Sequence, residues 1–408
     1  MYITVLCKVV DNFGDIGVAW RLCRRLAEIQ SKYKICLVVD DLDSFSKIES
    51  SVIASEAKQP ITINNIEIFP WNDHALCHEV FSQNDGERLS IILELFQCGR
   101  PDWMEKILFE EKLNRTVQII MIDYLTAEKY AEDFHCLQSL TRSAKVQKVN
   151  FMPGFTEKTG GLVIEEEWQQ LPEYKADGPV LVFTYENDWT DLVQGWLSAR
   201  TAGPVVECPK GVSKPHSVNR LLVAQGRGKE SFMSAVMSVV ECPRSGCIET
   251  TFVEELPYLN QTEWDKMMKT CSALVIRGEE SMSRACLSGI PFIWHAYPQS
   301  DEYQLVKVRA LLERMKPHFD KESYEIVSNA WLDINSSVSF PGLTRESVQD
   351  SDVQIVRSSR TMTQNPYAEF FAALSRLLPG FRDFALSLRK NGDLASNLMT
   401  YIEKLAII

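Results

Sequence analysis

Two carboxylates lie close together near the N-terminus, in a segment that also holds two glycines (residues 11–17, DNFGDIG). Gly14 and Gly17 permit a tight turn and the close approach of a ligand. Of the pair Asp11 and Asp15, one carboxylate could act as a general base while the other orients a cationic or hydroxyl nucleophile. The structural alternative is that Asp15 caps the following helix and Asp11 shapes the turn.

A dinucleotide site is another interpretation of the same segment. Its fingerprint requires glycine at positions 12, 14 and 17 and an acidic residue after the next strand, where Asp40 stands. Asn12 interrupts this pattern, and two carboxylates beside the loop would repel a pyrophosphate. The sequence therefore disfavours a nicotinamide cofactor.

A second segment suited to chemistry is RGEESMSR (residues 277–284), which follows the apolar run ALVI and opens a predicted helix. Exposed amides and hydroxyls at a helix start, with Arg277 beside them, favour an anionic diphosphate. The alternative is that Glu279, Glu280 and Ser281 are ordinary first-turn residues that complement the helix dipole.

Aromatic residues could supply the stacking surfaces of a nucleotide base. Tyr258 and Trp264 could stack on the base while Gln261 reads its edge. Further aromatics follow two predicted strands: Phe183, Tyr185 and Tyr297. The alternative for all of them is a place in the hydrophobic core.

The histidines do not indicate a metal site. His74 and His78 share a helix face at i and i+4, but no convincing remaining ligands lie near them. His295, inside the apolar run PFIWHAY, is expected to be a structural histidine with satisfied hydrogen bonds.

Charge and cysteine content restrict the partners and the compartment. Fifty-five acidic and 43 basic residues give a net charge of −12, which opposes nucleic-acid binding. Eleven cysteines without a CxxC pair indicate reduced, buried thiols. The N-terminus lacks the order of a signal peptide, and no apolar stretch approaches the roughly 20 residues of a membrane span. We expect a cytoplasmic protein with neither nucleic acid nor membrane as a partner.

The elements that must position these residues form two similar halves. At 408 residues the chain is longer than a single hydrophobic core usually supports, so two domains are expected. In the first half, strands are predicted at 2–10, 35–40, 61–69 and 117–124, and a helix at 18–30. The same alternation restarts after residue 178. There, strands are predicted at 179–185, 204–208, 249–256, 273–278 and 291–297, and helices near 188–199, 229–240, 261–271 and 279–288. This order predicts two doubly wound α/β units with parallel sheets.

The boundary between the halves is expected in the polar, irregular segment 154–178. It separates a first domain, 1–160, from a second, 175–385, and two helices near 367–378 and 383–405 close the chain. The Ser-rich segment 335–365 is predicted to be a flexible insertion without chemistry.

Three long motifs carry a resemblance to a known family. VVDNFGDIGVAWRLCRRLA near the start, MPGFTEKTGG at 152–161 and VIRGEESMSRACLSGIPFIWHAYPQSDEYQLVK at 275–307 resemble the EarP family of bacterial protein-arginine rhamnosyltransferases. The resemblance implies a GT-B fold, in which two Rossmann-like domains face each other across a cleft and a C-terminal helix, about 386–408, joins the first domain. It also implies dTDP-β-L-rhamnose as donor, an arginine of translation elongation factor P as acceptor, and inversion without a metal or other cofactor.

The same resemblance assigns roles to individual residues. It implies Asp15 as the base, Asp11 as its partner and Glu279 as the essential glutamate. Asn12, Phe13, Gly14 and Gly17 form the loop around the aspartates, and the implied donor-binding residues are Phe183, Tyr185, Tyr258, Gln261, Trp264, Arg277, Glu280, Ser281 and Tyr297. This chain departs from the family at Glu280, where the RGED motif has Asp, and at Tyr258 and Trp264, where the family has Phe.

Two other functions stay open at this point. The chain could be a GT-B glycosyltransferase for a small-molecule acceptor, or a non-catalytic protein that binds a nucleotide sugar and elongation factor P. The presence of Asp11, Asp15 and Glu279 together argues against a non-catalytic role.

Overall fold

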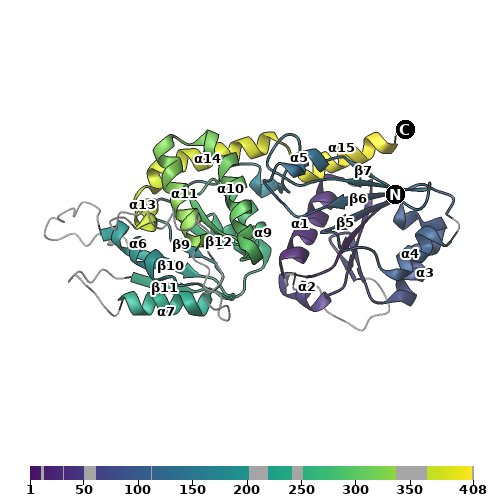
Figure 1. Ribbon diagram of the computed structural model, residues 1–408. Helices are drawn as coiled ribbons and strands as arrows, with labels where there is room; N and C mark the ends of the chain where they lie inside the picture. Colours follow the sequence, from purple (N-terminus) through teal and green to yellow (C-terminus); the bar gives the residue numbers. More distant parts are fainter. Residues whose placement is uncertain are drawn as a thin grey trace. The chain divides into compact units, whose positions relative to one another are not determined.

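The computed structural model describes residues 1–10, 13–30, 32–49, 61–111, 113–201, 219–240, 251–336 and 365–406. The chain divides into two compact units, each drawn from separate segments (Figure 1). Unit 1 comprises Met1–Leu171, Leu259–Asp265 and Ala385–Ile408; unit 2 comprises Pro172–Tyr258 and Lys266–Phe384. The predicted second domain, 175–385, contains residues 259–265, which the structure groups with unit 1.

Unit 1 is built on an eight-stranded sheet whose six inner strands are parallel. In spatial order the strands are β3 (Ile61–Ile63), β4 (Ile66–Pro70), β2 (Lys34–Val39), β1 (Tyr2–Cys7), β5 (Ile91–Leu95), β6 (Val117–Ile122), β8 (Val146–Asn150) and β7 (Gln138–Ser139). The two edge strands, β3 and β7, run antiparallel to their neighbours. The direction of winding reverses between β1 and β5, which marks the switch point of a doubly wound sheet.

Helices cover both faces of this sheet because its strands are apolar on both sides. The helices of unit 1 are α1 (Phe13–Ile29), α2 (Leu42–Ile48), α3 (His74–Gly86), α4 (Asp102–Phe109), α5 (Tyr130–Phe134) and α15 (Leu394–Ala406). Val5 of β1 belongs to one apolar cluster with Trp20 of α1 and Leu398 of α15, whereas the adjacent Leu6 packs with Phe81 of α3 on the opposite face. Burying each such side chain contributes about 1.5–3 kcal/mol.

In the residues that the structure describes, unit 2 carries a five-stranded sheet whose strands are all parallel. Its spatial order is β11 (Thr251–Glu255), β10 (Asn219–Val223), β9 (Val180–Val182), β12 (Ala273–Arg277) and β13 (Phe292–His295). The winding reverses between β9 and β12. Its helices are α6 (Thr190–Thr201), α7 (Lys229–Val240), α9 (Glu279–Ser288), α10 (Tyr303–Met315), α11 (Lys321–Ser336), α13 (Pro366–Ala372) and most of α14 (Leu374–Lys390).

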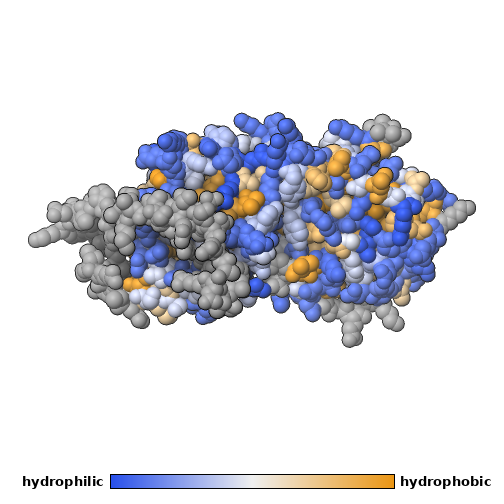
Figure 2. All heavy atoms as spheres, in the orientation of Figure 1, coloured by the Kyte–Doolittle hydropathy of each residue, from blue (hydrophilic) through white to orange (hydrophobic). Residues whose placement is uncertain are grey.

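The remaining elements are short or shared between the units. Helix α8 (Gln261–Met268) begins in unit 1 and ends in unit 2. Single 3-10 turns are η1 (Glu87–Leu89), η2 (Glu166–Trp168), η3 (Ser300–Glu302) and η4 (Lys316–His318). No helix in the described part of the chain is long and apolar enough to cross a membrane. The face in Figure 2 is largely hydrophilic, with apolar residues scattered over it.

Two doubly wound α/β units with parallel sheets were predicted, and the structure confirms them. Several boundaries were wrong. The predicted strand 61–69 is a hairpin, because Asn64 and Asn65 adopt φ values of 50° and 64° between β3 and β4. The division between the two units, at Leu171 and Pro172, lies inside the segment 154–178 where the boundary was expected. That segment is not polar throughout, because Val163, Glu165 and Trp168 are buried in unit 1.

Two predictions concern the segments 335–365 and 204–208 of the second half. The predicted insertion 335–365 begins too early, because Asn335 is a buried helical residue whose Oδ1 accepts a hydrogen bond from the Ala296 amide. Residues 337–364, like the predicted strand 204–208, lie outside the described residues.

The thiols are not all buried as predicted: Cys136 is exposed and Cys98 is half-buried.

Candidate active site

The switch point of unit 2 gathers four of the predicted site residues. In an open parallel sheet, ligands bind beyond the carboxyl ends of the strands where the winding reverses, here β9 and β12. Phe183 and Tyr185 directly follow β9, and Arg277 is the last residue of β12. Tyr297 follows the neighbouring strand β13, and its ring contacts that of Tyr185 edge-on at a centroid distance of 5.3 Å.

Arg277 lies against two of these aromatic rings. Its guanidinium carbon is 4.4 Å from the ring centroid of Phe183 and 4.6 Å from that of Tyr185. Cation–π contacts of this kind fix the position of a guanidinium while keeping its charge. Gly226 permits the close packing, because a Cβ at this position would lie only 2.9 Å from Nη2 of Arg277. We did not predict Gly226 from the sequence, where it appears as one glycine of an ordinary turn.

Helix α9 starts one residue after Arg277, so the amides of its first turn lie at the same place. Gly278, the residue before the helix, has φ of 73°, a left-handed conformation that favours glycine. Glu279 and Glu280 occupy the first turn, and Ser281 is buried. Lys307 of α10 reaches back so that its Nζ lies 2.8 Å from Oε1 of Glu279. Unit 2 therefore combines two cations with a helix N-terminus, the components of an anion site.

Lys307 was not among the residues predicted from the sequence. It lies 28 residues downstream of Glu279, and no local pattern connects the two. The available signal was its position as the last residue of the motif 275–307. The alternative interpretation, in which Glu279 only complements the helix dipole, leaves out the cationic partner of this carboxylate.

His295 is the structural histidine that the sequence predicted. It is 1% exposed, and its Nδ1 accepts a hydrogen bond of 3.3 Å from the amide of Tyr185. Burial, followed by the charge of Arg277, lowers the pKa of His295 to about 3. The imidazole is therefore neutral at physiological pH and supports the backbone under the aromatic cluster.

The switch point of unit 1 lies between β1 and β5, where the chain passes from β1 into α1. Asp11 and Asn12 lie outside the described residues. Asp15 is 3% exposed, and its Oδ2 accepts a hydrogen bond of 2.8 Å from the amide of Val10. Asp40, after β2, accepts one of 2.8 Å from the amide of Val9. Two carboxylates thus hold consecutive amides where the chain leaves β1.

The predicted loop is shorter than expected. Helix α1 begins at Phe13, so Gly14, Asp15 and Gly17 belong to its first turns. The helix begins early because Ile16 is buried in the apolar cluster of the sheet and Asp15 complements the helix dipole. Asp15 is therefore placed by a helix and not by a flexible loop.

The contacts between the segments that follow β5 and β6 at this switch point were not predicted. Phe96 and Gln97 follow β5 with φ of 54° each, an uncommon conformation for residues other than glycine. Gln97 donates a hydrogen bond of 2.8 Å from Nε2 to Oδ2 of Asp123, and Phe96 stacks on Tyr124 at 4.6 Å between centroids. Positive φ at these residue types leaves no signal in the sequence.

Gln261, predicted to read a base, lies against helix α1. Its Nε2 donates a hydrogen bond of 2.8 Å to the carbonyl of Gly17, and its Oε1 accepts one of 3.2 Å from Nη2 of Arg24. Trp264 is half-buried in the same unit, whereas Tyr258, in unit 2, is 72% exposed. The predicted donor-binding residues are therefore distributed over both units.

Of the histidine pair at 74 and 78, His78 contacts a carboxylate. Nε2 of His78 lies 2.6 Å from Oε1 of Glu111. Among the residues that the structure describes, no group of three or more His, Cys, Asp or Glu side chains could hold a metal ion.

Comparison with known proteins decides the family. Residues 3–403 match the family model described as Elongation-Factor P (EF-P) rhamnosyltransferase EarP. The chain belongs to the EarP family. It is 30% identical over 335 residues to the protein-arginine rhamnosyltransferase of Shewanella oneidensis, an alignment covering 76% of this chain and 79% of that protein. The corresponding protein of Pseudomonas aeruginosa is 27% identical over 362 residues, covering 83% and 88%.

The fold of the chain agrees with its membership of the EarP family. A solved structure that gives the structural basis for EarP-mediated arginine glycosylation of translation elongation factor EF-P matches with a TM-score of 0.53 at 18% identity, over 99% of each chain. The GT-B fold class predicted from the sequence is thereby confirmed, and the chain is a glycosyltransferase.

Proposed function

We propose that this EarP chain transfers L-rhamnose from dTDP-β-L-rhamnose to an arginine side chain of translation elongation factor P in the cytoplasm, with inversion and without a metal ion. The observation that carries the proposal is the placement of the two predicted groups: Arg277 and Glu279 lie at the switch point of one sheet, and Asp15 lies at that of the other. The curated relatives named as protein-arginine rhamnosyltransferases support the choice of sugar and acceptor.

The donor would bind at the switch point of unit 2. The diphosphate that leaves during transfer gains negative charge, and Arg277 and the amides at the start of α9 supply positive potential there. Phe183 and Tyr185 hold Arg277 in place through their ring faces. These groups can perform the task for which other enzymes use a metal ion.

The acceptor would be activated by carboxylates. A guanidinium stays protonated at physiological pH and has no free lone pair, so it is a poor nucleophile. In the proposed roles, Asp11 accepts hydrogen bonds from the guanidinium and Asp15 removes the proton as the carbon–nitrogen bond forms. Asp15 is well suited to a fixed position, because helix α1 and the hydrogen bond to the Val10 amide both hold it.

The stereochemistry follows from one displacement step. The guanidinium nitrogen attacks the anomeric carbon, the bond to the diphosphate oxygen breaks, and the proton of the nitrogen passes to Asp15. Attack and departure on opposite sides of the sugar invert the anomeric centre, as in inverting glycosidases.

The proposal is tested by coupling dTDP release to the acceptor. Purified enzyme is incubated with dTDP-β-L-rhamnose and either elongation factor P, the same factor with its acceptor arginine changed to lysine, or no acceptor. Release that requires the intact arginine supports the proposal. Release only with small-molecule acceptors favours a different glycosyltransferase activity, and donor binding without any release favours a non-catalytic protein.

A further inference from the structure

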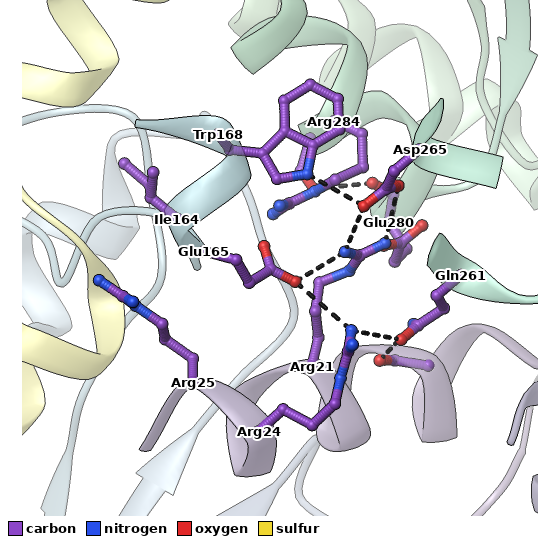
Figure 3. A network of polar contacts seen from close by, with 12 residues as sticks. Arg21, Arg24, Arg25, Ile164, Glu165, Trp168, Gln261, Asp265, Glu280 and Arg284 are labelled. Carbon is purple, nitrogen blue, oxygen red and sulfur yellow. Dashed lines mark hydrogen bonds and ion pairs between the residues drawn. The ribbon is translucent and has the colours of Figure 1, made fainter. Parts of the chain in front are cut away.

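Each unit contains a network of buried polar side chains that the proposed chemistry does not use. In unit 1 the network is ionic (Figure 3): Nη1 of Arg21 lies 2.7 Å from Oε1 of Glu165 and 2.7 Å from Oδ2 of Asp265. In unit 2 it is neutral and consists of Asn335 of α11 and Gln304 of α10, which are 1% and 2% exposed. This second network adjoins the anion site of its own unit, because it holds the chain at the end of β13.

Asn335 pairs with the outer edge of strand β13. Its Oδ1 accepts a hydrogen bond of 2.9 Å from the amide of Ala296, and its Nδ2 donates one of 2.7 Å to the carbonyl of Trp294. In the described sheet β13 is the last strand in spatial order, and an edge strand presents unpaired amides and carbonyls. The side-chain amide of Asn335 thus takes the place that one residue of a further strand would have.

The amide group of Asn335 is itself held in one orientation. Its Nδ2 donates a second hydrogen bond of 2.7 Å to the carbonyl of Trp331, one turn earlier in α11. Nε2 of Gln304 donates one of 3.3 Å to the backbone carbonyl of Asn335, and Oε1 of Gln304 accepts one of 3.1 Å from the amide of Gln299. Because both amide groups donate and accept, neither can turn over without losing hydrogen bonds. Together they fix the backbone at residues 294–299.

The fixed segment contacts Tyr185 twice. Nδ1 of His295 accepts a hydrogen bond of 3.3 Å from the amide of Tyr185, and the ring of Tyr297 lies edge-on to the Tyr185 ring at 5.3 Å between centroids. The Tyr185 ring centroid in turn lies 4.6 Å from the guanidinium carbon of Arg277. A shift of residues 294–299 would therefore move a surface on which Arg277 rests.

An apolar residue at position 335 could fill the same volume but could not replace these contacts. It would leave the amide of Ala296 and the carbonyl of Trp294 without partners, and both residues are buried. The end of β13 would then move toward other partners, because buried backbone groups are almost always paired. The side chain of Asn335 therefore specifies one position for this segment.

We infer that Asn335 is a positioning residue for the donor site. By pairing with the edge of β13 it sets the position of residues 294–299 and, through Tyr185, the position of Arg277. Gln304 supports the same segment at its far end. The inference rests on the proposed function for its ligand, because Arg277 is proposed to bind the diphosphate of the donor.

The same helix offers a matched control. Ser323, near the start of α11, is 1% exposed, and its Oγ donates a hydrogen bond of 2.7 Å to Oδ2 of Asp320. Asn335 stands at the other end of this helix. Ser323→Ala therefore removes a buried polar contact from α11 without removing a hydrogen bond to residues 294–299.

The experiment compares Asn335→Ala, Gln304→Met and Ser323→Ala with the unvaried enzyme, each well below its melting temperature. Titration calorimetry with dTDP gives the Kd, steady-state kinetics give the KM for donor and acceptor separately, and hydrogen exchange follows the amides of residues 294–299. Asn335→Ala is expected to raise the dTDP Kd and the donor KM about tenfold, with the acceptor KM unchanged. Exchange at 294–299 becomes faster.

The other two variants separate positioning from stability. Gln304→Met nearly preserves volume and removes the hydrogen bonds to the Gln299 amide and the Asn335 carbonyl, so the dTDP Kd rises by a smaller factor of about three to five. Ser323→Ala lowers the melting temperature and leaves the dTDP Kd and the exchange at 294–299 unchanged. Should Asn335→Ala fail to fold, Gln304→Met carries the test.

A double-mutant cycle tests the route through Tyr185. If Asn335 acts on Arg277 through the Tyr185 ring, its loss has little further effect once that ring is absent. In a Tyr185→Leu background, Asn335→Ala is expected to raise the dTDP Kd about threefold or less, instead of about tenfold. A merely structural role of Asn335 would give the same factor in both backgrounds.

Three results would overturn the inference. The first is a dTDP Kd within about twofold of the unvaried enzyme in folded Asn335→Ala, or in Gln304→Met where Asn335→Ala does not fold. The second is an equal loss in Ser323→Ala, and the third is the full effect of Asn335→Ala in the Tyr185→Leu background. An unvaried enzyme that binds no dTDP contradicts the proposed function and the inference together, whereas normal binding that the variants leave unchanged contradicts the inference alone.

Discussion

Nζ of Lys307 lies 2.8 Å from Oε1 of Glu279, which connects helix α10 to the first residue of helix α9. Both side chains are about one-quarter exposed, so the pair is partly shielded from water. A carboxylate at this position would otherwise oppose an incoming diphosphate, and the ammonium compensates for its charge. The pair explains how an acidic residue is compatible with an anion site.

Replacement of this lysine tests the pair. Lys307→Met is expected to lower kcat/KM for the donor about tenfold or more, because Glu279 loses its counter-ion and the site loses a cation. Kinetics with varied donor and saturating acceptor measure the effect. The control is Lys321→Met, which removes an exposed lysine whose Nζ lies 3.9 Å from Glu325. Equal activity of Lys307→Met and Lys321→Met would exclude a role for the pair.

Asp15→Asn should reduce transfer by about 10²–10⁴-fold, the usual contribution of a general base. The dTDP Kd should stay nearly unchanged, because an amide oxygen can still accept the hydrogen bond from Val10. Single-turnover rates and calorimetry separate the two quantities. Asp40→Asn is the control, since Asp40 binds the neighbouring amide of Val9 in the same way. Turnover by Asp15→Asn at the unvaried rate would refute its role as the base.

Gly226→Ala should weaken dTDP binding. Its Cβ would lie 2.9 Å from Nη2 of Arg277 and would displace the guanidinium from the rings of Phe183 and Tyr185. We expect the dTDP Kd to rise about tenfold, a loss of about 1.4 kcal/mol. Gly226 itself has φ of 152°, so the strain of a positive φ needs a control, and Gly99→Ala provides one because Gly99 has φ of 71° and nothing within 4 Å of the new Cβ. An equal change in both variants would mean that the displacement of Arg277 is not the cause.

His295 makes stability depend on pH in a defined direction. Its folded pKa is about 3 and its unfolded pKa is about 6.5, so between these values the unfolded state binds the additional proton. Stability therefore falls as the pH falls below about 6.5, by about 1.4 kcal/mol between pH 7.5 and 5.5 from this group alone. Urea unfolding at the two pH values measures it.

The variant that isolates this contribution is His295→Asn, which keeps an acceptor for the Tyr185 amide. Its stability should change less between pH 7.5 and 5.5 than that of the unvaried protein, by about 1.4 kcal/mol. The same pH dependence in His295→Asn and in the unvaried protein would contradict the assignment.

The parts of the fold that follow from local sequence were predicted well. Strand β12 and helix α9 were placed almost to the residue, because a continuous apolar run ends at a glycine and an acidic first turn begins there. Strand β5 was missed. It carries Glu94, a buried carboxylate that is compensated by Arg100 at 2.5 Å, and a charge inside a short apolar run conceals a strand.

The site was predictable only where motifs mark it. Arg277 and Glu279 stand in one motif and Asp15 in another, so their proximity to switch points could be anticipated. Contacts between distant segments could not be predicted from the sequence. The link from Gly226 to Arg277 and that from Arg21 to Asp265 depend on how helices pack over the sheets, and spacing along the chain does not encode that packing.

The central claim is that an arginine of elongation factor P receives the sugar. Intact-mass analysis of that factor after incubation with enzyme and dTDP-β-L-rhamnose, followed by fragmentation to locate the modification, tests it most directly. We predict one deoxyhexose on one arginine, and none when Asp15→Asn replaces the unvaried enzyme. An unmodified factor alongside active turnover of the donor, or a sugar attached to a residue other than arginine, would contradict the account.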